Sequence, residues 1–233
     1  MTGSLRRNHR AASTAAGLAV VGALLTGSGV GVLQEAAAAP AASTVVGRAP
    51  HDDSLQKKIA LYTTMRQLWT DHMQWTYSTV NAFFHNKAAL PPTLDRLLRN
   101  QKDIGDAMAP YYGRAAGDKL AGLLTTHIKE AVPVLQAAQA NNKKALDKAL
   151  ADWYANAKQI ADFLTSANPK NWPASVTEPM LKAHISQTTV YSVDLLKGDY
   201  AKSIKDYGKA FDHMMGLSDT LSKGVVAQFP DKF

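Results

Sequence analysis

The histidines are the residues of this chain with the clearest capacity for chemistry. His72, His127 and His184 each fall on the apolar face of a different predicted helix, close to its midpoint. Imidazole binds zinc and copper without help from thiolates. Antiparallel helices of similar length bring their midpoints to one level, so the three rings can converge if their helices are adjacent. The pattern therefore predicts a copper or zinc site in the middle of a helical bundle.

The tripeptide Asp-His-Met occurs twice, beginning at Asp71 and at Asp212, and it suggests accessory ligands. Asp71 or Asn156 is a candidate to hold a ring nitrogen from outside the ligand layer, and Met214 offers the soft sulfur that copper favours. His213 lies about 120° from the centre of its helix's apolar face, which makes it a weaker candidate. Neighbouring side chains diverge by about 100° on a helix, so the repeat itself is interpreted as coincidence.

Two other functions remain open for the three histidines. They can be buried polar residues that fix the helix register in a structural or interaction protein of the cell envelope. They can also serve as general acid and base in an enzyme, but no catalytic residue is predicted beside them, which favours a role without catalysis. After the first forty residues the only glutamates are Glu130 and Glu178, too few for a carboxylate-bridged di-iron bundle. Nucleotide loops, nucleophile elbows and zinc-protease motifs do not occur.

Apolar residues recur at steps of three and four along nearly the whole chain, and alternating β-branched runs are missing. This periodicity predicts an all-α fold, an up-and-down bundle of five long helices and one short helix. Pro110 is expected to end the short helix. Ser175 and Glu178 have the spacing of a capping box at the start of the fifth. The helices are expected at residues 52–86, 93–109, 114–140, 145–167, 175–196 and 200–229, within a single domain at 52–233.

The first residues have the order of an export signal. Arg6, Arg7 and Arg10 form a basic head, a weakly apolar stretch follows, and small residues offer a cleavage site after Ala38. The sequence predicts a signal peptide at 1–38, read by the general secretory or the twin-arginine route, and a flexible leader at 39–51. The apolar stretch is too rich in glycine for a stable transmembrane anchor. The protein is therefore expected outside the cell or at its envelope.

The net charge and the lack of cysteine restrict the kinds of partner that the protein is expected to bind. The net charge is +7 and cysteine is absent, which excludes disulfides and thiolate ligands. Lysines alternate with aspartates near the C-terminus instead of forming a basic patch, so nucleic acid is not an expected partner. A metal ion is the expected partner, and an envelope partner of unknown kind is compatible with the composition.

Several stretches resemble a family of small bacterial helical proteins to which no activity is assigned: LWTDHMQWT, RLLRNQKDIG, PYYG, LLTTHIKEA, WYANAKQIADFLTSANP, MLKAHISQTT and QFPDKF. They extend over residues 61–233. The family pattern includes the positions of His72, His127, His184, Trp75 and Asn156, so the resemblance implies a shared bundle and a shared polar layer. Some members are automatically labelled acetylglutamate kinase or glycosyltransferase, but this chain has neither a nucleotide loop nor a predicted sheet.

Overall fold

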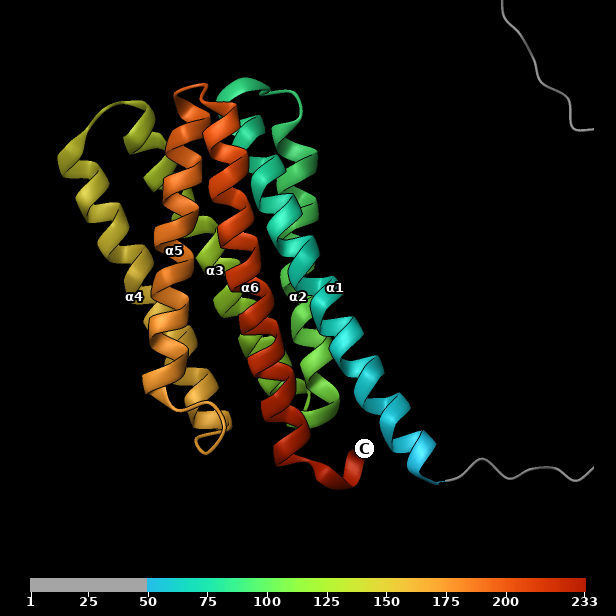
Figure 1. Cartoon of the computed structure of the whole chain (residues 1–233). Helices are drawn as coiled ribbons and strands as arrows, with labels where there is room; N and C mark the ends of the chain where they lie inside the picture. Colours follow the sequence, from blue (N-terminus) through green and yellow to red (C-terminus); the bar gives the residue numbers. More distant parts are fainter. Residues whose placement is uncertain (1–49) are drawn as a thin grey trace, which may run out of the picture. The chain divides into compact units, whose positions relative to one another are not determined.

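The computed structural model describes the backbone from Pro50 and the side chains from Asp53 to the C-terminus, and this part of the chain is all-helical (Figure 1). The predicted all-α class is thus confirmed. The predicted export signal at 1–38 and nearly all of the leader at 39–51 lie outside the described residues. The helices are α1 (Pro50–His85), α2 (Leu90–Tyr112), α3 (Arg114–Gln139), α4 (Lys143–Ala167), α5 (Ala174–Leu196) and α6 (Tyr200–Gln228), followed by the 3-10 turn η1 (Pro230–Lys232).

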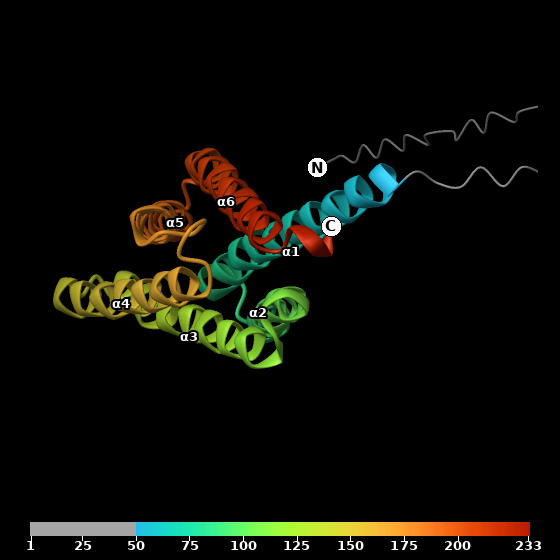
Figure 2. The same ribbon diagram turned by 90° about the horizontal axis from the view of Figure 1, so that it is seen from below.

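Successive helices run in alternating directions and are joined by short turns (Figure 1). Each helix packs against the next one along the chain, and α6 packs back against α1, which closes the ring. Helix α5 also contacts α1 and α3 across this ring. The view along the bundle shows these neighbours around the circuit (Figure 2). The cross-contacts of α5 are the feature of the fold that matters most for the histidines.

Helix starts and turns follow local chemistry at several places. Asn142 and Asp199 cap α4 and α6, because each side chain accepts a hydrogen bond from the backbone N–H three residues later. At the start of α5 the capping-box prediction is wrong. The helix begins at Ala174 with Pro173 in the cap position and has no side-chain cap, and the Glu178 carboxylate instead pairs with Lys182 at 2.6 Å.

The prediction that Pro110 ends the second helix is also wrong. Helix α2 continues through Pro110 to its last residue, Tyr112. Gly113 is its C-cap, and a φ of 87° there suits glycine. Its first turn holds Pro91 and Pro92, where a missing N–H costs nothing. The last turn is retained by tertiary packing, since aromatic rings of the C-terminus cover it: Tyr111 contacts Phe229 and Phe233, and Tyr112 contacts Phe229.

Three glycines allow two close approaches within the core. Gly105 on α2 and Gly117 on α3 face each other's backbones, and a Cβ at Gly117 would lie 2.5 Å from the Gly105 carbonyl oxygen. Gly224 on α6 lies directly under the indole of Trp172, which is fully buried and donates from Nε1 to the Thr220 carbonyl. The first contact joins α2 to α3, and the second holds the loop between α4 and α5 against α6.

The exposed helix faces carry ion pairs at i, i+4 spacing, for example Lys143–Asp147, Lys148–Asp152 and Lys158–Asp162. Such pairs each stabilise a helix by a few tenths of a kcal/mol at most. Both side chains of each of these pairs are exposed, so this face of α4 is solvated. None of the helices from Pro50 onward combines the length and the hydropathy needed to cross a membrane.

Candidate functional site

The structure brings the three predicted histidines together in one layer. His72 of α1, His127 of α3 and His184 of α5 are each at most 3% exposed. The His184 ring lies between the other two, with ring centroids 5.6 Å from His72 and 5.8 Å from His127. The cross-contacts of α5 with α1 and α3 make this possible. Adjacency of these helices, which the sequence analysis had to assume, is therefore present.

The side chain of His127 is held by Asn156 of α4. The Asn156 amide donates to the Leu123 carbonyl, which directs its oxygen towards the imidazole. His127 Nδ1 then donates to this oxygen at 2.9 Å, so Nε2 keeps its lone pair. Nε2 is buried and makes no hydrogen bond within the protein. A metal-binding histidine shows the same pattern, with one ring N–H oriented by an outer acceptor and the other nitrogen free.

His72 has the opposite arrangement. The Gln101 amide donates to the Leu97 carbonyl at 2.7 Å and, more weakly, to His72 Nδ1 at 3.4 Å. His72 Nδ1 is therefore the acceptor and Nε2 carries the proton. In this tautomer Nε2 cannot bind a metal. His72 would have to move its proton to Nδ1, and the Gln101 amide would have to turn to receive it.

His184 forms ring contacts with the other two histidines, and its buried Nδ1 makes no hydrogen bond. It is thus the least constrained member of the layer. A buried polar atom without a partner costs stability, on the order of 1–3 kcal/mol. Such a cost at the centre of the bundle is expected at a functional position, where stability is given up for binding.

Burial keeps the layer uncharged at neutral pH. Desolvation, reinforced by the nearby His127, lowers the pKa of His72 to about 3. Desolvation also lowers the pKa of His127 to about 4, although Asn156 partly opposes it. The pKa of His184 lies well below its ordinary value because of burial and the two neighbouring imidazoles. Neutral imidazole is the form that binds metal, so protons do not compete at pH 7.

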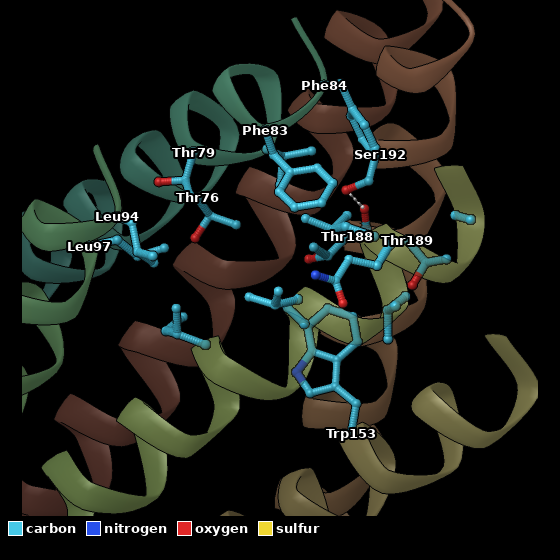
Figure 3. A pocket seen from close by; sticks show the side chains of 18 of the residues that line it. Thr76, Thr79, Phe83, Phe84, Leu94, Leu97, Trp153, Thr188, Thr189 and Ser192 are labelled. Atoms are coloured by element: carbon cyan, nitrogen blue, oxygen red, sulfur yellow. Dashed lines mark hydrogen bonds between the residues drawn. The ribbon is translucent and has the colours of Figure 1, made fainter. Parts of the chain in front are cut away.

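A cavity of about 270 Å³ adjoins the histidine layer. Its walls come from α1 to α5 and are almost entirely apolar, as Figure 3 shows for Phe83, Leu97 and Trp153. Threonine and serine side chains interrupt the wall at Thr76, Thr79, Thr188, Thr189 and Ser192. None of the lining residues is Asp, Glu, Lys or Arg. The histidine layer therefore borders a cavity without charged side chains.

Of the accessory ligands suggested by the sequence, only Asn156 contacts the histidine layer. The Asp71 carboxylate accepts from Arg96 at 2.8 Å and from Gln67 at 2.9 Å, and not from a ring nitrogen. His213 is half-buried, and its Nε2 donates to the Met180 carbonyl, which links α6 to α5. Met214 is fully buried in the core and does not line the cavity. Asn156 alone orients a member of the layer.

Sequence reasoning missed the cavity and the role of Gln101. Inward-facing threonines were the available signal, because Thr76, Thr79 and Thr188 stand at helix positions where a tightly packed core would have Leu or Ile. Gln101 is 0% exposed on α2, and a fully buried glutamine is uncommon without a specific polar partner. Trp153 of α4 also lines the cavity, and its ring centroid lies 5.2 Å from that of His127.

Comparison with protein-family models, with curated proteins and with solved structures gives no match. Within residues 53–233, no three His, Cys, Asp or Glu side chains already stand in the arrangement of a metal site. The histidine layer and the adjoining cavity are thus the features of residues 53–233 that point to a function.

His184→Leu is expected to leave the free energy of unfolding at pH 7 unchanged or to raise it by about 1–2 kcal/mol. Leucine has a similar volume and removes the buried Nδ1 that has no partner. His127→Leu is the matched contrast, with an expected loss of about 1–3 kcal/mol, because it deprives the Asn156 oxygen of its donor. Urea unfolding of both variants measures this. A large loss of stability in His184→Leu would favour a purely structural role for the layer.

Proposed function

We propose that the protein is an exported binding protein that holds copper or zinc through His72, His127 and His184. The observation that carries this proposal is the gathering of three neutral imidazoles from three helices in one buried layer. Three imidazoles with one open position suit either ion. None of the residues lining the adjoining cavity is Asp, Glu, Lys or Arg, and the Ser192 hydroxyl donates to the Thr188 carbonyl instead of to a histidine, so binding is a better fit than turnover.

The donor set fits a metal at two positions and needs adjustment at the third. His127 already has its outer ring N–H on Asn156 and its Nε2 free. His184 has an unpartnered Nδ1. His72 must change tautomer, with rotation of the Gln101 amide. Since the rings border a cavity, they can turn towards a common ion without displacing the backbone.

The alternative function is a structural or interaction protein of the cell envelope. Two contacts favour it: Gln101 ties His72 to α2, and Asn156 ties His127 to α4. Buried polar pairs of this kind can specify helix register. This alternative requires His184 to stabilise the bundle through its ring contacts with His72 and His127, because its buried Nδ1 makes no hydrogen bond. The His184→Leu experiment therefore separates the two functions.

Elemental analysis of the tag-free chain, purified from a host that exports it, is expected to show about one copper or zinc ion per chain. His72→Ala, His127→Ala and His184→Ala should each lose the metal while the far-ultraviolet circular dichroism stays helical. His213→Ala is the control and should retain it, because His213 lies outside the layer. An absence of metal, together with no uptake of Cu(I), Cu(II) or Zn(II) on titration, would reject the proposal.

A further inference from the structure

Several residues that line the cavity beside the histidine layer have buried polar atoms without a partner. Nearly all buried polar atoms in folded proteins have a hydrogen-bond partner. Five that lack one within the described chain belong to residues lining this single cavity: Thr79 Oγ1, His127 Nε2, Trp153 Nε1, His184 Nδ1 and Thr188 Oγ1. Small-molecule sites have this composition, with mostly apolar walls and a few polar groups that orient the ligand.

Two of these atoms define the functional group that the cavity would accept. His127 Nε2 is an acceptor, because Nδ1 is the protonated nitrogen. Trp153 Nε1 is a donor. The centroids of the two rings lie 5.2 Å apart and both residues line the cavity, so we take one bound group to bridge them. A hydroxyl both donates and accepts, and it therefore satisfies this pair, whereas an ether lacks the proton for His127.

Size and charge restrict the rest of the ligand. A cavity of about 150 Å³ is enough to bind benzene, and this one has about 270 Å³. A single ring with a short alkyl chain, or two small rings, would fill it. The walls contain no Asp, Glu, Lys or Arg that could neutralise an ion, and a buried unpaired charge is costly. The ligand must then be uncharged.

We propose that this cavity binds a neutral, largely apolar molecule with one hydroxyl group, of which an alkylphenol is the simplest representative. The hydroxyl lies between His127 and Trp153, and the apolar part extends along Val80, Phe83 and Leu97. Gln136 of α3 lines the cavity and is exposed, so the ligand can enter beside it. This proposal goes beyond metal binding and does not depend on it.

The first test is titration of the full chain with 4-propylphenol in the presence of a chelator. Calorimetry and thermal unfolding detect the binding. We expect one phenol per chain, binding by its methyl ether weaker by about tenfold, and no binding of 4-propylbenzoate. Failure of the phenol to bind, or equal binding of the benzoate, would overturn the proposal. Equal binding of the ether would overturn the assignment of the hydroxyl. Because a chelator is present, none of these results depends on the metal.

Substitutions then locate the site. Ala131→Phe fills the cavity and should abolish phenol binding, whereas Ala115→Phe, exposed on the same helix, should not change it. Trp153→Phe keeps a ring and removes the donor, so the preference for the phenol over its ether should shrink several-fold. If Ala131→Phe fails to fold, Trp153→Phe still tests whether the phenol binds in this cavity. Unchanged phenol binding and preference in Trp153→Phe would place the ligand elsewhere and contradict the proposal.

Discussion

Gly105→Ala is expected to lower the free energy of unfolding by about 3 kcal/mol or more. A Cβ at this position on α2 would overlap the carbonyl oxygen of Gly117 and lie 2.9 Å from the Cβ of Ala121, both on α3. A backbone atom cannot move aside like the end of a flexible side chain, so the two helices must separate. Urea unfolding measures the loss.

Gly122→Ala on α3 is the matched control for this result. Nothing lies within 4 Å of a Cβ at Gly122, and the residue is exposed in mid-helix. Alanine there should raise the stability by about 0.5–1 kcal/mol, because glycine is a poor helix former. If Gly105→Ala behaved like this control, the close approach of α2 and α3 would be wrong.

The metal-free protein is expected to lose stability steeply as the pH falls below about 6.5. In the unfolded chain the three buried histidines take up protons near their ordinary pKa, whereas in the folded chain they stay neutral until about pH 4 for His127 and about pH 3 for His72. Acid therefore favours the unfolded state. The free energy of unfolding falls by about 1.4 kcal/mol per pH unit for each histidine, which makes about 4 kcal/mol per pH unit for the three together.

Urea unfolding in chelator at pH 7.0, 6.0 and 5.0 measures this slope. The double variant His72→Leu/His184→Leu should lose roughly two thirds of it, since two of the three contributing groups are gone. Asp206→Asn is the control for a contribution of carboxylates to the pH dependence of stability. Lys209 and Lys202 lower the pKa of Asp206 to about 2, so its contribution is lost only below about pH 4 and the slope above pH 5 should stay as in the parent protein. An unchanged slope in the double variant would contradict the assignment of the acid sensitivity to the layer.

These expectations have one cause in common. The bundle holds uncharged polar groups and a cavity at its centre, where a protein selected for stability alone would have packed aliphatic side chains. The close helix contacts elsewhere, such as Gly105 against Gly117 and Trp172 against Gly224, contribute to stability together with the apolar core. The proposed binding and the stability would thus depend on different residues, which substitutions can test separately.

The sequence by itself determined the helices and the direction in which their histidines face. The reason is local: a repeat of 3.6 residues sorts each side chain to the buried or the exposed face before any helix meets another. His72, His127 and His184 were placed inside on this basis, and His213 towards a helix border, where it is half-buried. Local signals failed at Pro110 and at Ser175, where packing of neighbouring segments or a different cap position prevailed.

Only the tertiary structure decided how the histidines meet. Helix α5 contacts α1 and α3 across the ring, and no periodicity along one chain segment reports a contact between segments more than fifty residues apart. The proton positions depend on Gln101 and Asn156, which come from two further helices. The cavity arises because the side chains of five helices together fail to fill the space between them. Volume left over in a core is a property of the whole packing, and no single helix encodes it.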